Sequence, residues 1–547
     1  MRFLQVTYQA ALVAAMGSLV SAATFKNHYY DYIVVGGGPA GIISAERFAE
    51  AGKKVLLLER GVGPTVETGA NDTITWNKSL TPIDLPGLSA DVGSLPEWEK
   101  YMCTDTEGMA ACVLGGGVTV NYMVFVHPPE HDFDDNNNWP EGWKWKDLKP
   151  AAERLYKRNP GTTLPSADGK RYDQGMYSVL SKFFNGIGWN AVDMISEPNE
   201  KHKVYSHPSW NIADQKRAGP VRTYLPLAEK RDNFSLELGV KVLRVVRSGS
   251  KITGVEVETS SGKTEIITLA HDGRVILSSG ALSTPRLLFN SGIGPKKQIE
   301  TAKKSGINVP PKKDWLDLPV GLGFRDHPIF TLNVQTNGSF GIPDYDAIIN
   351  GTDRKDIALY KKNSGIITQG KHRAIFFSSN ELNGQTRYYQ GSCAPAEDSV
   401  IEIKTYLTHG AVSSGVLGLD SNQKTVIEKT PYLSSDEDYK ATASFVEELI
   451  NDISSPGSGL ELITKPNVTA ILSNIASGNH YTTTAKLGTD DGRKGGSSVV
   501  DLNTKVYGTD NLFIVDGSIH PDLPTGNIQT TIMVIAEAAA ARILAQH

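Results

Sequence analysis

The first clear pattern along the chain is a pair of short apolar segments separated by a helical repeat. Residues 31–35 read DYIVV and residues 54–58 read KVLLL, with Glu59 closing the second segment. Between them, residues 42–51 have the apolar spacing of a helix, which Gly52 ends. Uninterrupted apolar strands are typical of a parallel sheet covered on both faces. The pattern therefore predicts a βαβ unit at the start of the fold.

Three further segments have clear patterns. Residues 234–246 alternate in polarity and predict one strand leading into a second strand at 254–257. Residues 512–515 form a short apolar strand, and residues 528–545, rich in alanine, predict a helix.

An apolar run at residues 10–20 follows Arg2 and ends at the small residues Ser21, Ala22 and Ala23. This is the pattern of a secretory signal peptide, here residues 1–22, which predicts a secreted, extracellular protein. The alternative is an N-terminal membrane anchor, but the run is shorter than the ~20 residues that a span needs. No later segment is long and apolar enough to cross a bilayer.

Composition narrows the class of protein only modestly. The chain has 547 residues, 39% of them hydrophobic, and a net charge of −5. These values are ordinary for a globular protein, and the lack of a basic excess argues against nucleic acid as a partner. In an exported chain the Asn-x-Ser/Thr sequons are candidate glycan sites. They lie at Asn71, Asn77, Asn233, Asn337, Asn350 and Asn467.

The chain has three cysteines, Cys103, Cys112 and Cys393. An odd number leaves at least one free, and the pair closest in sequence, Cys103 and Cys112, is the expected disulfide. Three buried thiols are the alternative. Their spacing does not match a zinc site, and no metal is expected.

The turn after the first strand carries the pattern G-x-G-x-x-G at Gly36, Gly38 and Gly41. The first glycine permits a tight turn, the second lets the backbone approach a pyrophosphate, and the third lets the helix pack close to the sheet. Glu59 ends the next strand and is placed to accept hydrogen bonds from an adenosine ribose. Together these features predict a dinucleotide site, without separating FAD from NAD.

Four other segments resemble the signatures of the glucose-methanol-choline (GMC) oxidoreductases, a family that uses FAD. They are 115–121 (GGGVTVN), 280–294 (GALSTPRLLFNSGIG), 319–328 (PVGLGFRDHP) and 511–527, which contains NLFIVDGS and ends in TGN. The resemblance implies an α/β fold in which a Rossmann-like FAD-binding domain is interleaved with a substrate domain built on an antiparallel sheet. It places the FAD domain at about 31–135, 215–320 and 495–547, and the substrate domain at about 136–214 and 321–494.

The resemblance also assigns the chemistry. His480 matches the catalytic histidine of the family, and a neutral imidazole can take the proton of an alcohol hydroxyl. Asn527 matches the second active-site position, where a carboxamide can orient the substrate oxygen but cannot act as a base. We assign no chemistry to His327. His520 is expected to be structural, with a role as the catalytic histidine as the alternative. Cofactor contacts are expected at Gly36, Gly38, Gly41, Glu59, Gly116, Gly117, Asn121, Val242, Asp516 and Gly517.

Asn121 stands where some members of the family carry a histidine bonded to the flavin, so we expect dissociable FAD. His127 is the only nearby alternative. A helix beginning just after Asn527 would also favour negative charge on the reduced flavin through its dipole.

Within the family, the chain looks most like the flavin domain of fungal cellobiose dehydrogenases, although residues 122–127 depart from the expected aromatic-rich segment. No haem domain is expected ahead of residue 31. The most favoured function is oxidation of the anomeric carbon of a mono- or oligosaccharide to a lactone, with electrons passed to a quinone, oxygen or a separate redox protein. The alternatives are oxidation of a nonsugar alcohol with oxygen as acceptor, and a noncatalytic FAD-binding protein. Trp139, Trp143 and Trp145 are candidates for a substrate pocket, although core packing is the favoured interpretation.

Overall fold

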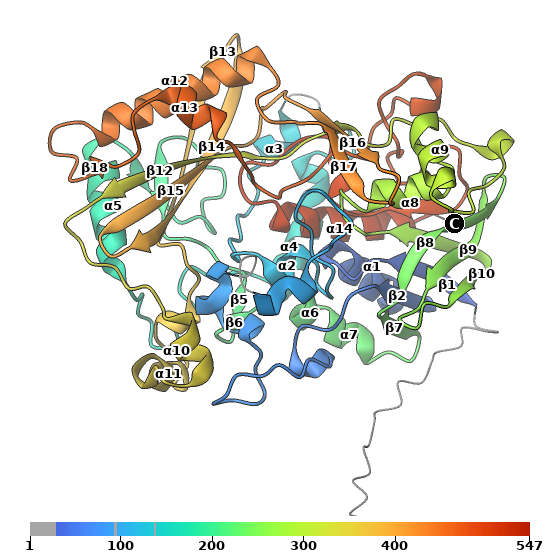
Figure 1. Ribbon diagram of the computed structural model, residues 1–547, viewed down its shortest axis with the longest axis horizontal. Coiled ribbons are helices and arrows are strands. Elements are labelled where there is room, and N and C mark those ends of the chain that lie inside the picture. Colours follow the sequence, from blue (N-terminus) through green and yellow to red (C-terminus); the bar gives the residue numbers. More distant parts are fainter. Residues whose placement is uncertain (1–28, 92–95, 136–137, 547) are drawn as a thin grey trace, which may run out of the picture.

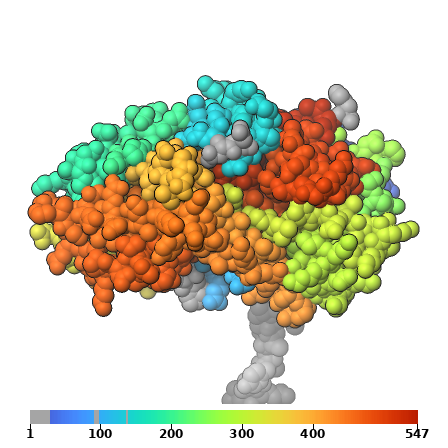
Figure 2. All heavy atoms as spheres, turned by 90° about the horizontal axis from the view of Figure 1, so that it is seen from above, coloured from blue at the N-terminus to red at the C-terminus, as the bar shows by residue number. Residues whose placement is uncertain are grey.

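The computed structural model describes residues 29–91, 96–135 and 138–546 (Figure 1). The predicted signal peptide lies outside these residues. Two sheets lie side by side along the long axis of the molecule (Figure 1). Seen from above, the orange segments form the surface toward one end of the molecule and the yellow-green segments the surface toward the other (Figure 2). None of the helices in the described part of the chain combines the length and apolar character needed to span a bilayer.

The predicted βαβ unit is present as β1 (Tyr30–Val35), α1 (Pro39–Glu50) and β2 (Val55–Glu59). It forms the centre of the first sheet, whose order is β7-β2-β1-β10-β9-β8. β7, β2, β1 and β10 run parallel, and β20 joins the C-terminal part of β10 in the same direction. The remaining strands are β7 (Phe234–Leu238), β8 (Lys241–Ser248), β9 (Lys251–Glu258), β10 (Thr264–Leu277) and β20 (Leu512–Ile514).

The prediction of one strand over residues 234–246 was wrong, because the chain turns in the middle of this segment. Gly239 adopts φ 71°, a left-handed conformation that glycine reaches without strain. β7 then pairs with β2 at one edge of the sheet, and β8 pairs with β9 at the other. Alternating polarity described both strands correctly but did not reveal the break between them.

Three helices cover the first sheet and share its apolar core. They are α1, α4 (Trp145–Arg158) and α14 (Gln529–Leu544), which lies within the predicted helix. In α14 the fully buried Glu537 accepts a hydrogen bond of 2.7 Å from Tyr224 Oη and forms ion pairs with Arg47 and Arg154. This contact links all three helices. Trp139 and Trp143 lie in the same core, as the packing interpretation expected.

The second sheet is largely antiparallel, with the order β18-β12-β15-β14-β13-β4-β3, and β19 joins β12. Helices α5 (Gln174–Gly186) and α12 (Asp436–Ile453) contribute to its core. The sequence prediction of the fold class is thereby confirmed. The strands are β3 (Asn190–Ala191), β4 (Val204–Ser206), β12 (Pro328–Gln335), β13 (Ala374–Leu382), β14 (Gln385–Glu397), β15 (Val400–Leu407), β18 (Glu461–Leu462) and β19 (Ala476–Ser477).

Smaller elements connect the two layers. β11 (Leu322–Phe324), β16 (Gly415–Leu419) and β17 (Thr425–Lys429) form a three-stranded sheet, and β5 (Ile212–Ala213) pairs with β6 (Lys216–Arg217). The other α-helices are α2 (Gly117–Val120), α3 (His131–Asp134), α6 (Pro220–Thr223), α7 (Leu225–Glu229), α8 (Thr284–Asn290), α9 (Lys296–Lys304), α10 (Tyr345–Asn350), α11 (Arg354–Tyr360) and α13 (Val468–Ser473). The first sheet collects strands from residues 30–59, 234–277 and 512–514, and the second from residues 190–206 and 328–477, so the two layers are interleaved along the chain. The domain boundaries remain a prediction. Helix α4, which lies in the segment predicted for the substrate domain, packs in the apolar core of the first sheet.

Candidate active site

A cavity of about 500 Å³ is lined by residues of both sheets. This volume is within the range of small-molecule and cofactor sites. Its wall contains residues at the C-terminal ends of β1 and β2, and residues of β12 and β15 from the second sheet. Of the residues predicted from the sequence, all but Gly41 line it. They are Gly36, Gly38, Glu59, Gly116, Gly117, Asn121, Val242, His480, Asp516, Gly517 and Asn527.

One end of the cavity is formed by the turn between β1 and α1. Gly36 has φ 105°, and a Cβ there would lie 2.5 Å from the carbonyl oxygen of Ser278. Gly38 is the residue before α1 and has no side chain that could cap the helix. The first backbone N–H groups of α1 therefore have no acceptor from this residue's side chain. A Cβ built on Gly38 would meet only Ser278 O, at 3.8 Å, which leaves open space in front of the helix N-terminus. These features fit the pyrophosphate of FAD.

Gly41 has a different role, because it does not line the cavity. A Cβ at this position would lie 1.9 Å from the carbonyl oxygen of Gly36. The residue lets α1 approach the turn closely, which is the packing role expected for the third glycine of the motif.

Glu59 is buried at the end of β2 and lines the cavity. Its carboxylate accepts hydrogen bonds of 2.7 Å from the backbone N–H groups of Gly37 and Gly61. Burial raises the pKa of Glu59, and these hydrogen bonds oppose the increase. Its predicted contact with an adenosine ribose stays a prediction.

Asp516 follows β20 and joins it to the turn after β10. One carboxylate oxygen accepts hydrogen bonds from Gly280 N, at 2.9 Å, and Thr284 Oγ1, at 2.6 Å, and the other accepts from Ser518 N at 2.8 Å. The donors come from two of the predicted signature segments, 280–294 and 511–527. The Asp516 side chain therefore holds these two segments together at the cavity wall.

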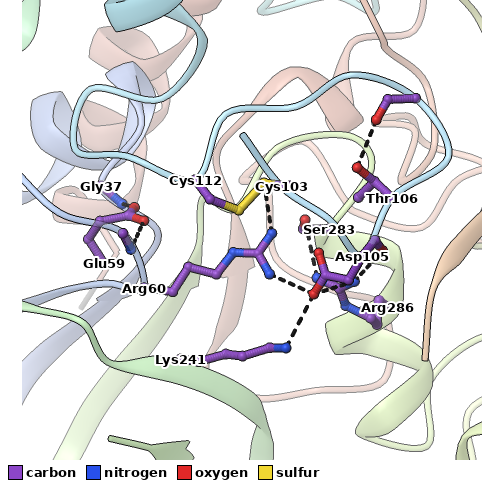
Figure 3. Close-up of a disulfide and its surroundings, with 12 residues drawn as sticks. Gly37, Glu59, Arg60, Cys103, Asp105, Thr106, Cys112, Lys241, Ser283 and Arg286 are labelled. Atoms are coloured by element: carbon purple, nitrogen blue, oxygen red, sulfur yellow. Dashed lines mark hydrogen bonds and ion pairs between the residues drawn. A yellow bond between two sulfur atoms is a disulfide. The ribbon is translucent and has the colours of Figure 1, made fainter. Parts of the chain in front are cut away.

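The predicted disulfide between Cys103 and Cys112 is present and closes a loop beside the cavity (Figure 3). Cys103 lines the cavity, whereas Cys393 is buried and free. Burial alone would raise the pKa of Asp105 in this loop, but nearby cations lower it well below its usual value. Ion pairs to Asp105 therefore hold this loop in place together with the disulfide. The cations that converge on Asp105 are Arg60 at 2.7 Å, Arg286 at 3.0 Å and Lys241 at 3.2 Å.

The two predicted catalytic side chains, 47 residues apart in sequence, meet at the cavity wall. His480 Nε2 lies 3.2 Å from Asn527 Nδ2, and both residues are partly exposed. Desolvation by the surrounding protein lowers the pKa of His480 to about 4. The imidazole is therefore neutral at pH 7, the state that a general base requires.

A buried carboxylate holds the His480 segment in place. Asp326 Oδ1 accepts hydrogen bonds from the backbone N–H groups of His480, at 2.7 Å, and His327, at 2.8 Å. Its Oδ2 accepts from Ser477 Oγ at 2.6 Å and Tyr432 Oη at 2.8 Å. Asn479 adopts φ 56°, which asparagine tolerates better than most residues.

Two side chains behind the catalytic pair were not identified from the sequence. His327 Nδ1 lies 2.9 Å from His480 Nδ1, and Gln390 Nε2 lies 2.7 Å from Asn527 Oδ1. His327 belongs to a recognised segment, but the sequence pattern there assigns it no chemistry. Gln390 lies within β14, and no local pattern marks it, because only pairing within the second sheet brings it to Asn527.

Other candidate residues have structural roles. His520 and His127 do not line the cavity; His520 packs edge-on against Trp139, and His127 stacks on Tyr156. Asn121 does line it, and its carboxamide oxygen accepts a hydrogen bond of 2.9 Å from Met123 N. A carboxamide cannot form the histidyl bond to flavin described above, so dissociable FAD remains our expectation.

Another part of the cavity wall combines aromatic, apolar and cationic groups. Tyr122 is 40% exposed and contacts His372 edge-on, with ring centroids 5.6 Å apart. Tyr406, Lys404 and Ile329 complete this part of the wall. It offers an aromatic face and few fixed charges to a substrate.

Comparison with known proteins agrees with this architecture. Two family models, both described as GMC oxidoreductase, match residues 30–329 and 411–536. The chain is 27% identical to an uncharacterised GMC-type oxidoreductase of Rhodococcus erythropolis, over 94% of this chain and 98% of the relative. It is 25% identical to an oxygen-dependent choline dehydrogenase of Photobacterium profundum, over 95% and 93% of the two chains.

Solved structures show the same fold. The formate oxidase of Aspergillus oryzae has a TM-score of 0.76 at 21% identity, covering 95% of this chain and 99% of that chain. A fungal aryl-alcohol oxidase has a TM-score of 0.71 at 20% identity, covering 94% and 99%. These similarities leave the narrower likeness to cellobiose dehydrogenases as a prediction.

The turn before α1 provides a direct test of the FAD site. We expect Gly38→Ala to fold normally but to retain at least tenfold less FAD, because the added methyl group occupies the space in front of the helix N-terminus. Flavin absorbance per protein after gel filtration measures retention, and circular dichroism checks the fold. Gly186→Ala is the matched control, since a Cβ there meets nothing within 4 Å and the residue does not line the cavity. Equal FAD content in both variants would contradict the assignment.

Proposed function

The chain belongs to the GMC oxidoreductase family and is an FAD-dependent enzyme acting on CH–OH groups, and from this premise we propose that His480 and Asn527 form its catalytic pair. The single observation that carries the proposal is the contact of 3.2 Å between His480 Nε2 and Asn527 Nδ2 at the wall of the cavity. A base and an orienting amide on one cavity wall are what removal of a hydroxyl proton needs.

Three side chains of the protein have separate roles in this reaction. His480 Nε2 takes the hydroxyl proton, and the Asn527 amide donates a hydrogen bond to the same oxygen and fixes its orientation. Asp326 holds the backbone of His480, so that the ring keeps its position as the proton arrives. Bound FAD supplies the acceptor for the hydride that leaves the carbinol carbon.

For the substrate we propose a mono- or oligosaccharide oxidised at its anomeric carbon to a lactone. The support is the partly exposed ring of Tyr122, together with Tyr406, in the wall of the cavity. Flat aromatic rings pack well against the apolar faces of sugar rings. Lys404 at the same wall adds a hydrogen-bond donor for sugar hydroxyls.

A second candidate is a nonsugar alcohol. Ile329 and Met109 make part of the cavity wall apolar, and the names of two similar proteins, a choline dehydrogenase and an aryl-alcohol oxidase, refer to nonsugar substrates. The oxygen-dependent relative supports oxygen as acceptor in this case, whereas a quinone or a separate redox protein is the proposed acceptor for the sugar reaction.

We further propose that the protein is secreted and glycosylated. The apolar run of residues 10–20 supports export, and four sequon asparagines, Asn71, Asn337, Asn350 and Asn467, are exposed. The side chain of Asn233 instead donates hydrogen bonds to the carbonyl groups of Ala49 and Lys53, so a glycan is not expected there.

Replacement of the base should abolish most activity without loss of cofactor. We expect His480→Ala to lower the rate of flavin reduction by about 10²- to 10⁴-fold, measured by anaerobic stopped-flow absorbance. His271→Ala is the control, because that side chain is 88% exposed and does not line the cavity. Unchanged reduction in His480→Ala would rule out its role as the base.

The same base predicts the pH dependence. His480 must be neutral to accept a proton, and its pKa is lowered to about 4. We expect kcat/KM to be flat from about pH 5 to pH 7 and to fall as the pH decreases through about 4. An acid limb near pH 6.5, the ordinary value for histidine, would contradict a desolvated base.

A substrate panel separates the two proposed reactions. Sugars and nonsugar alcohols are mixed anaerobically with the enzyme, and loss of flavin absorbance identifies the donor. If sugars are the donors, we expect Tyr122→Ala to raise their KM about tenfold, whereas Tyr122→Phe, which keeps the ring, leaves it nearly unchanged. Readmission of air or addition of a quinone then identifies the acceptor. Bleaching by nonsugar alcohols alone would reject the sugar proposal.

Export is tested by the N-terminus of the mature protein. We expect protein recovered from the medium of a eukaryotic host to begin near Ala23, as measured by mass spectrometry. Retention inside the cell with an intact N-terminus would contradict secretion.

A further inference from the structure

Four side chains, two in the cavity wall and two behind it, form a continuous hydrogen-bonded series. In order they are Gln390, Asn527, His480 and His327. The series begins at a backbone N–H group, which can only donate, and its far end faces a backbone carbonyl, which can only accept. These two fixed ends determine where each proton in the series lies.

The first link fixes the orientation of the Gln390 amide. The backbone N–H of Asn527 donates to Gln390 Oε1 at 3.0 Å, so the atom at that position must be the carbonyl oxygen. The Gln390 Nε2 group then donates to Asn527 Oδ1 at 2.7 Å and to Ser392 Oγ at 3.0 Å. Gln390 is only 1% exposed, so water has little access to these contacts.

The second link fixes the Asn527 amide and, through it, His480. Because Asn527 Oδ1 accepts from Gln390, the group that faces His480 Nε2 at 3.2 Å is the NH₂ donor Nδ2. His480 Nε2 must therefore be the unprotonated nitrogen of the ring.

The third link, between His480 and His327, is consistent with an unprotonated Nε2 on His480. A neutral His480 with a free Nε2 carries its proton on Nδ1, which donates to His327 Nδ1 at 2.9 Å. His327 is fully buried, burial lowers its pKa well below the usual value, and its own proton must then lie on Nε2. That atom has no hydrogen bond within 3.5 Å among the described residues, but it interacts with the carbonyl of Pro524 at longer range, as an N–H group would.

We propose that Gln390 is a positioning residue that sets the tautomer of His480, keeping the lone pair on Nε2 at the cavity wall. Its functional consequence rests on the proposed role of His480 as the base: only the tautomer with a free Nε2 can accept the hydroxyl proton. Gln390 does not line the cavity and acts entirely through Asn527.

The test is Gln390→Glu in the FAD-loaded enzyme. A carboxylate accepts from the backbone N–H of Asn527 but cannot donate to its Oδ1. We therefore expect the Asn527 amide to turn over, so that its oxygen faces His480 Nε2. The proton of His480 then moves from Nδ1 to Nε2, and the proton of His327 moves from Nε2 to Nδ1, which keeps the hydrogen bond between the two rings. The readout is the pair of ring ¹⁵N chemical shifts in histidine-labelled protein at pH 7, with the His480→Gln spectrum identifying the resonances. We expect the two shifts to exchange and the flavin reduction rate to fall about 100-fold.

Two further variants make the result decisive. Asn527→Asp imposes the same reversal from the neighbouring residue, since its carboxylate can accept from both Gln390 and His480, and it serves if Gln390→Glu fails to fold. Gln385→Glu is the matched control: it lies on the same strand and also loses a donated hydrogen bond, of 2.8 Å to Gly410 O, but has no link to His480. In this control variant we expect His480 to have the same tautomer as in the unmodified enzyme.

The proposal is overturned if His480 carries its proton on Nε2 in the unmodified enzyme, or if both Gln390→Glu and Asn527→Asp leave the shifts unchanged. Because the spectrum needs no substrate, it is independent of turnover. Retained activity in His480→Ala would remove the base assignment but leave the tautomer result intact, so the two failures are distinguishable.

Discussion

The arrangement at the cavity depends on the buried carboxylate of Asp326. It accepts hydrogen bonds from the backbone of His327 and His480 and from the hydroxyl groups of Ser477 and Tyr432. Burial raises the pKa of Asp326, and the donors around it oppose that increase. One side chain just before β12 thus helps to fix the segment that carries the catalytic imidazole, together with the pairing of the short strand β19 with β12.

The cavity owes its chemistry to the meeting of two differently built layers. The first layer contributes backbone: a glycine turn, the start of α1 and the ends of parallel strands, all suited to hold phosphates and a ribose. The second contributes side chains from an antiparallel sheet, where alternate residues point to one face. Gln390 reaches Asn527 in this way.

Burial then tunes the groups where the layers meet. His480 and His327 are both kept neutral by desolvation, and hydrogen bonds rather than charges orient them. An imidazole that is neutral and oriented can accept a proton over a wide pH range. Two clusters of charged contacts lie away from this histidine pair, one around Asp105 at the loop closed by the disulfide and one around Glu537 between α1, α4 and α14.

The sequence by itself determined the βαβ unit, its glycine turn, Glu59 and the final helix, because each depends on short-range periodicity or on backbone geometry at one residue. Resemblance added His480 and Asn527, which carry recognisable neighbours. Tertiary structure alone decided the split of residues 234–246 between opposite edges of the sheet, since the alternation of polarity is the same on both sides of Gly239. It alone also revealed the partners of the catalytic pair. Gln390 is 137 residues from Asn527, and His327 is 153 from His480, so only the pairing of distant strands brings them within hydrogen-bond distance.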